Sequence, residues 1–114
     1  MPKKAIWISY DLGIKGDFPG LYAWFDNQDA KEAGNSIAFL NYEFSGPDNQ
    51  LLSKLKQDLE KNVNFKPGDR IYVVRMRTDN GIQKISGKFI IGKRRAAPWV
   101  GYGDSDNDIA DENE

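Results

Sequence analysis

Asp11 is the acidic residue best placed for chemistry. It ends an apolar, β-branched and aromatic run, residues 5–11 (AIWISYD), which predicts a central strand. An acid at the carboxyl end of such a strand projects toward the crevice where open α/β sheets bind ligands. There it could hold Mg²⁺ through waters and phosphate oxygens and serve as a catalytic carboxylate. The alternative is that Asp11 only caps the loop that follows it.

A second group of residues could bind a polyanion. Residues 66–95 contain nine bases and only two acids. A basic cluster followed by an aromatic ring is suited to phosphate contact plus base stacking. The predicted nucleic-acid-binding residues are Arg75, Arg77, Lys88, Lys93, Arg94, Arg95 and Trp99. The alternatives are a solvated face, basic protection of an exposed edge strand, and a Trp99 segment that folds back over the sheet.

Two residue types are missing, and their absence limits the possible activities. The chain has neither cysteine nor histidine. This excludes disulfides, thiolate zinc sites, cysteine nucleophiles, imidazole acid–base catalysis and histidine metal sites. The apolar run near the N-terminus is too short for a signal peptide or a membrane span. We therefore expect a cytoplasmic protein that does not associate with membranes.

The net charge of -1 at pH 7 conceals an uneven distribution. Six acids and no bases lie in residues 104–114, which leaves sixteen bases and eleven acids in residues 1–103, a net charge of +5. This division and the length of 114 residues predict a single α+β domain over residues 1–103. Residues 104–114 are predicted to form an acidic, disordered tail, whose simplest role is to keep the chain in solution.

Hydrophobic periodicity predicts two helices. Asp17 followed by Phe18-Pro19 is typical of a capped helix start. The helix is expected to end near Gly34, with a break around residues 27–30 as the alternative. A second helix is indicated by one apolar stripe, formed by Leu51, Leu52, Leu55, Leu59 and Val63. Most aromatic side chains are expected in the core, namely Trp7, Trp24, Phe25, Phe39 and Phe44.

The remaining periodic segments predict strands. Residues 36–44 read as one strand, or as two short strands joined by a tight bend. Residues 70–78 and 85–93 flank Asn80-Gly81, a strong hairpin signal. The order β-α-β-α-β-β predicts a ferredoxin-like sandwich, with one sheet of four to five strands, two helices on one face and a C-terminal hairpin. A parallel βαβ unit followed by an antiparallel hairpin is the alternative.

A first strand ending in Ser9-Tyr10-Asp11, a capped helix, the apolar 36–44 segment and a leucine-striped helix together resemble two groups of small ferredoxin-like proteins. These are the proteins of CRISPR adaptation and the virulence-associated protein D toxins. The resemblance extends over most of residues 5–95. It implies a homodimer, a divalent cation held by Asp11, and nucleic acid as partner or substrate.

Three segments depart from that family layout: the Lys15-Gly16-Asp17 loop, the segment around Trp99 and the acidic tail. They bear on activity more than on fold. The chain is therefore predicted to be a small nucleic-acid-associated protein, with a metal-dependent ribonuclease of toxin or CRISPR-accessory type as the enzyme hypothesis. The alternative is a non-catalytic protein-interaction or inhibitor module.

Overall fold

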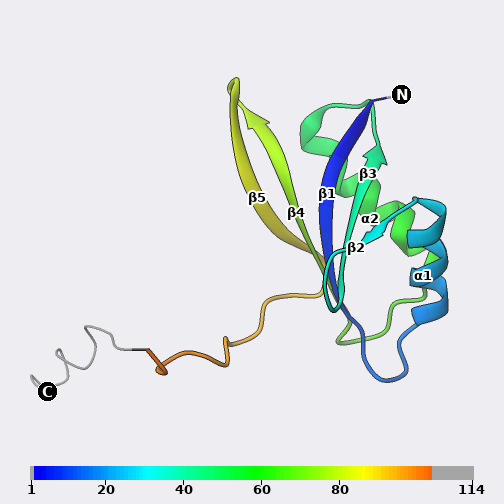
Figure 1. The fold of residues 1–114 in the computed structure, drawn as a ribbon, viewed down its shortest axis with the longest axis vertical. Helices are drawn as coiled ribbons and strands as arrows, with labels where there is room; N and C mark the ends of the chain where they lie inside the picture. Colours follow the sequence, from blue (N-terminus) through cyan, green and yellow to red (C-terminus); the bar gives the residue numbers. More distant parts are fainter. Residues whose placement is uncertain (1, 104–114) are drawn as a thin grey trace, which may run out of the picture.

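The computed structural model describes residues 2–103, so the predicted acidic tail lies outside the described residues. Five strands form one sheet in the order β2-β3-β1-β4-β5, and all neighbouring strands are antiparallel (Figure 1). Two helices, α1 (Phe18–Asn27) and α2 (Leu51–Asn62), contribute to a single core against the sheet. The α+β class is confirmed, and the alternative with parallel strands is wrong.

The central strand is β1 (Lys3–Asp11), between β3 (Ile37–Glu43) and β4 (Arg70–Asp79). The two outer strands differ greatly in length, since β2 spans only Lys31–Glu32 whereas β5 spans Ile82–Ile91. The first helix is shorter than predicted because the segment after Asn27 turns back and supplies β2. The strands β4 and β5 are consecutive in the sequence, and they form the longest strand pairing in the sheet.

The β4–β5 turn explains why β5 begins three residues earlier than predicted. Asn80 and Gly81 both have positive φ, at 52° and 79°. Two such residues form the turn whose twist matches paired strands, and only glycine and asparagine adopt it readily. Pairing therefore continues to the Asp79–Ile82 pair beside the turn.

Asp17 fixes the start of α1, as its sequence context predicts. Its carboxylate accepts a hydrogen bond from the Gly20 N–H at 3.0 Å and another from the Asn64 N–H at 2.8 Å. These two backbone donors lower the pKa of Asp17. The same side chain thus caps a helix and ties it to the chain that leaves α2.

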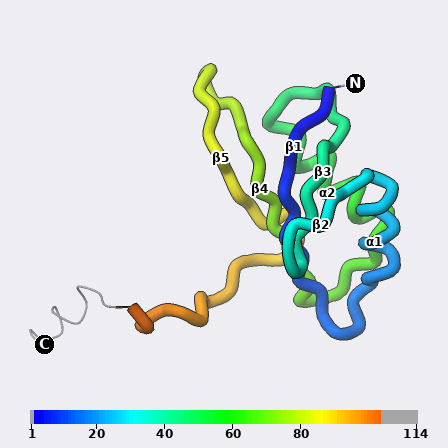
Figure 2. The backbone as a smooth tube through the Cα atoms, in the orientation of Figure 1, coloured from blue at the N-terminus to red at the C-terminus, as the bar shows by residue number. Residues whose placement is uncertain are grey.

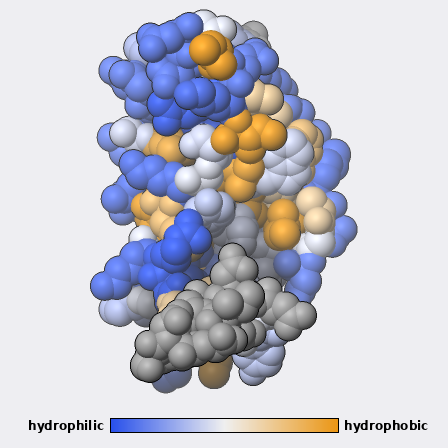
Figure 3. Space-filling model, turned by 90° about the vertical axis from the view of Figure 1, so that its left-hand side faces the viewer, coloured by the Kyte–Doolittle hydropathy of each residue, from blue (hydrophilic) through white to orange (hydrophobic). Residues whose placement is uncertain are grey.

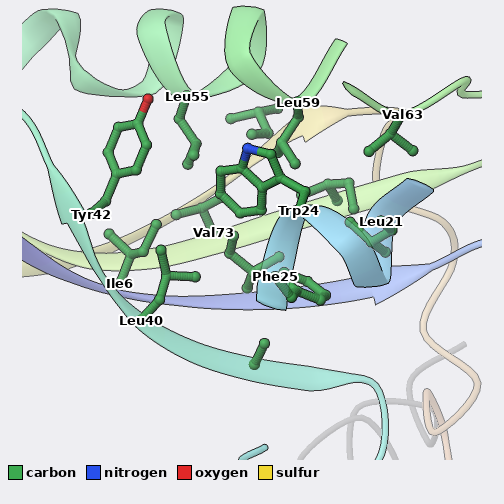
Figure 4. Close-up of a cluster of buried hydrophobic side chains, with 14 residues drawn as sticks. Ile6, Leu21, Trp24, Phe25, Leu40, Tyr42, Leu55, Leu59, Val63 and Val73 are labelled. Atoms are coloured by element: carbon green, nitrogen blue, oxygen red, sulfur yellow. The ribbon is translucent and has the colours of Figure 1, made fainter. Parts of the chain in front are cut away.

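The core lies between the sheet and the two helices. Leu55 and Leu59 of α2 are fully buried and approach the ring of Trp24 from α1 (Figure 4). Tyr42 lies beside them, with its hydroxyl donating to a carboxylate oxygen of Asp58 at 2.8 Å. Burial is the main cause that raises the pKa of Tyr42, and the hydrogen bond to Asp58 raises it further. The leucine stripe thus packs as the sequence predicted.

The β4–β5 pair extends past the rest of the sheet. The pairing of β1 with β4 stops at Ile6 and Arg75, whereas β4 and β5 remain paired up to the turn. The two strands diverge from β1 toward that turn (Figure 2). No helix within residues 2–103 is long and apolar enough to cross a membrane.

Candidate nucleic-acid interface

The face of the sheet turned away from the helices is rich in aromatic side chains. Successive residues of a strand point to opposite faces. In β1, Ile6 and Ile8 are fully buried, whereas Trp7 between them retains 44% of its exposure. Cross-strand register places Phe39 of β3 opposite Trp7, and Tyr72 of β4 opposite Ser9. Side chains from β1, β3 and β4 therefore share this helix-free face.

The aromatic side chains form two contacting pairs. The ring centroids of Trp7 and Phe39 are 4.8 Å apart, and those of Tyr72 and Phe89 are 4.7 Å apart. Gly87 makes room for the second pair, because a side chain there would collide with the Tyr72 ring. Trp7 and Tyr72 lie on adjacent strands at diagonal positions, which aromatic side chains can bridge. The two pairs lie on the same face of the sheet, and we call them together the aromatic platform.

Two guanidinium groups cover one end of the aromatic platform. The guanidinium carbon of Arg94 lies 5.5 Å from the Tyr72 centroid and 5.3 Å from the Phe89 centroid. That of Arg70 lies 5.5 Å from the Phe89 centroid. These distances are within the range of cation–π attraction. Flat cations and flat rings thus lie together at the surface.

A small hollow of about 230 Å³ opens at this end of the platform. We call it the arginine–aromatic hollow; its lining residues are Ser9, Asp11, Arg70, Tyr72, Phe89 and Arg94. The space-filling view shows a molecular face on which hydrophobic side chains are interspersed with hydrophilic ones (Figure 3). The hollow therefore offers apolar rings, cationic donors and one carboxylate in a single place.

Asp11 is engaged by arginine. Its Oδ2 atom accepts hydrogen bonds from Nε of Arg70 at 3.0 Å and from Nη2 of Arg70 at 2.6 Å, and Nη1 of Arg95 lies 3.9 Å away. Two guanidinium groups beside one carboxylate do not fit a Mg²⁺ site, which needs several oxygen ligands. Within residues 2–103, no group of three potential metal ligands occurs. The roles of Asp11 in metal binding and catalysis stay predictions.

Three of the predicted nucleic-acid-binding residues lie on the other face of β4 and β5. Arg75 is buried, and its Nη1 atom lies 3.1 Å from both carboxylate oxygens of Asp48 in the 3₁₀ helix η1 (Asp48–Gln50). Arg77 and Lys88 line an open cleft of about 770 Å³ with them. The odd-numbered residues of β4 face the helices, and Lys88 of β5 is paired with one of them, Val73. These three basic residues are therefore separated from the aromatic platform.

The other predicted residues follow β5, and only one lies at the platform. Arg94 is the base that contacts its rings, whereas Nη2 of Arg95 donates to the backbone oxygen of Gly68 at 3.0 Å. Lys93 lines a separate small cavity with Arg95. Trp99 is 73% exposed on a segment that runs away from the sheet (Figure 1), so it does not cover the sheet.

Most residues of the platform were not predicted from the sequence to form a binding surface. Trp7 and Phe39 were expected in the core, but Trp7 is half exposed and Phe39 is only partly buried. The missed signal is alternation: Trp7, Ser9 and Asp11 alternate with Ile6, Ile8 and Tyr10 along β1. Tyr72 and Phe89 lie 17 positions apart and meet only through the register of β4 and β5.

Comparison with family models, with curated proteins and with solved structures found no match to this chain. The geometry of the platform is therefore the basis for assigning a function.

Proposed function

We propose that this protein binds single-stranded nucleic acid on the aromatic platform. The observation that supports this most strongly is the position of Arg94, whose guanidinium lies over Tyr72 and Phe89 on a face without helices. An arginine plane on aromatic rings offers a stacking surface and hydrogen-bond donors together. The unstacked bases of a single strand require a surface of this kind.

Stacking would supply the contacts to the bases. Trp7 is 44% exposed and tilted against Phe39, so part of its ring surface is open to solvent. Stacking of a base on an aromatic side chain contributes about 1–3 kcal/mol and tolerates any base. Two aromatic pairs on one face would accommodate neighbouring bases of the same strand.

The phosphates would be contacted by basic side chains around the platform. Arg70 and Arg94 flank the hollow, and Lys93 and Arg95 adjoin Arg94 in the chain. Residues 1–103 carry a net charge of +5, which favours a polyanion. Arg70 and Arg94 thus bring positive charge directly to the aromatic platform.

The proposal is for binding and not for cleavage. Asp11 is held by Arg70 and flanked by Arg95, an arrangement that favours an ion pair over a cation site. We also propose that the fold is a ferredoxin-like variant with β5 added at the edge. The order β4-β1-β3-β2 and the shared core of the two helices support this, in agreement with the family resemblance.

The test is fluorescence anisotropy with a labelled ten-nucleotide uridine RNA at low salt. We expect Trp7→Ala and Arg94→Ala each to weaken binding by about tenfold, the loss of one stacked base. A duplex of the same length should bind more weakly, because its base faces are covered.

Two matched variants serve as controls. Tyr22→Ala removes a half-exposed aromatic ring from α1, and Lys56→Ala removes an exposed base from α2; both should leave RNA affinity unchanged. The proposal fails if the wild-type protein does not bind the RNA. It also fails if the platform variants bind as tightly as the wild type.

A second candidate function is protein interaction through the outer edge of β5. This strand is ten residues long and ends the sheet, so one of its edges has no neighbouring strand within residues 2–103. Met76, Ile82 and Ile85 near the turn are at least half exposed. An open edge with apolar side chains favours pairing with another chain, including a second copy. Light scattering of the wild type and of Ile85→Lys tests it: a monomer in both cases would exclude the homodimer.

A further inference from the structure

We infer that the arginine–aromatic hollow selects guanine over adenine and cytosine, and that Asp11 is the residue that makes this distinction. The inference rests on the proposed function and adds a base preference to it. Asp11 is half exposed within a surface otherwise suited to phosphates, where a carboxylate by itself would oppose binding.

The two oxygens of Asp11 differ in what they contact. Both hydrogen bonds from Arg70 go to Oδ2, and Arg95 also approaches Oδ2. Within residues 2–103, Oδ1 accepts no hydrogen bond. A carboxylate has about four acceptor positions, so this oxygen can accept donors from a ligand.

The ion pair therefore presents an acceptor beside a donor. Asp11 offers oxygen lone pairs, and Arg70 retains N–H groups that do not bond to Asp11. Guanine has the complementary edge, with an N1–H and an N2 amino group as donors and O6 as the neighbouring acceptor. Adenine and cytosine each offer a single amino group next to a ring nitrogen acceptor, which would face the carboxylate unfavourably.

The geometry of the hollow supports a single base at this position. Its volume of about 230 Å³ is below the roughly 300–1,000 Å³ usual for whole small-molecule ligands. Arg94, Tyr72 and Phe89 provide the planar surfaces, and Asp11 and Arg70 lie at the same hollow. A base stacked there would have its edge, and not its ring face, toward the ion pair.

The experiment compares nine-nucleotide RNAs that differ only at the central position. The flanking nucleotides are uridines, and the centre is guanine, inosine, adenine or cytosine. Affinities are measured by competition against a labelled uridine RNA. We expect the guanine RNA to bind about tenfold more tightly than the adenine and cytosine RNAs. Inosine, which lacks the N2 amino group, should bind less tightly than guanine.

Asp11→Asn tests the assigned residue. It keeps the shape of the side chain but removes the charge and one acceptor, so the preference for guanine should fall to near one. Affinity for the all-uridine RNA should rise, because the change removes a negative charge from a surface proposed to contact phosphates. A purely structural defect would lower that affinity. Asp26→Asn, at an exposed acid on α1, is the matched control and should retain the preference.

The outcomes separate the inference from the proposed function. Equal binding of the guanine, adenine and cytosine RNAs by the wild type would overturn the inference and leave single-strand binding intact. Equal binding of guanine and inosine would also overturn it, and this measurement does not depend on a variant that folds. If Asp11→Asn keeps the preference for guanine, Asp11 is not the residue that recognises the base. Absence of all RNA binding would overturn both.

Discussion

The two faces of the sheet are made from alternate residues of the same strands, yet they differ in almost every physical respect. On the helix-covered face, Ile6, Ile8 and Val73 are at most 1% exposed. On the helix-free face, Trp7 retains 44% of its exposure between two of those buried residues. The first face excludes water and stabilises the fold, whereas the second keeps aromatic surface accessible to a ligand.

The arginines of β4 show the same difference in charge. Arg75 faces the helices and is neutralised by Asp48, and among residues 2–103 its Nε atom has no hydrogen-bond partner. Arg70 faces the other side, where it lies against Phe89 and remains beside an open hollow. A basic residue in this sequence therefore has a structural or a binding role according to the face that it occupies.

The largest expected effect is a loss of stability from a substitution on the helix-covered face. Leu55→Ala should lower the free energy of unfolding by about 2–5 kcal/mol, because Leu55 is fully buried and the change leaves a cavity. Chemical denaturation measures this. Trp7→Ala removes a larger side chain from the other face, yet it should cost less stability because Trp7 is already half exposed. A greater loss for Trp7→Ala would contradict the assignment of the two faces.

The next effect concerns the arginines of the helix-facing side. Arg75→Met should lower the free energy of unfolding by about 1.5–3 kcal/mol, since it removes the charged hydrogen bonds to Asp48 from a buried position. Arg77→Met, two residues along the same face, should change stability by less than about 0.5 kcal/mol because Arg77 is exposed. Similar urea midpoints for these two variants would refute a structural role of Arg75.

The Arg75–Asp48 contact should also depend on pH. Burial by itself would raise the pKa of Asp48, but hydrogen bonds from Arg75 and the Thr78 N–H, with the charges of Arg75 and Lys4, lower it overall. A lowered folded-state pKa gives stability that is present above the unfolded value, about 3.9, and is lost as pH falls through the folded value. Asp48→Asn should therefore be less stable than the wild type at pH 7.

Urea titrations of both proteins from pH 7 downward would measure that difference. It should shrink below about pH 4 as the wild-type carboxylate becomes protonated. A difference that stays constant down to about pH 2 would show that the charge of Asp48 does not contribute.

The smallest expected effect involves residues 104–114, which carry six acids. If the platform binds nucleic acid, a tethered acidic segment competes with phosphates at high effective concentration. Residues 1–103 alone should therefore bind RNA more tightly than the full chain, by a factor that shrinks as salt rises to about 0.5 M. Anisotropy at two salt concentrations measures this, and the melting temperature should barely change. Equal affinities at low salt would reject the competition.

Local sequence rules were sufficient for several elements of the fold. Three signals depend only on residues that are close in the sequence. They are the cap at Asp17, the leucine stripe of α2 and the turn residues Asn80-Gly81. The helix end predicted near Gly34 was wrong, because Lys31–Glu32 pairs with β3 across the sheet. That pairing is a long-range contact, which periodicity within the segment does not reveal. The alternative break around residues 27–30 agrees with the end of α1 at Asn27.

The sequence by itself determined which residues alternate in β1 and β4 and that basic residues cluster in positions 66–95. Only the tertiary structure decided which side of each strand the helices cover, and hence that Arg75 is buried while Trp7 stays accessible. The register of three strands brought Asp11, Tyr72 and Phe89 to one hollow. Periodicity specifies two faces for every strand, but which face is excluded from water depends on packing between elements far apart in the chain.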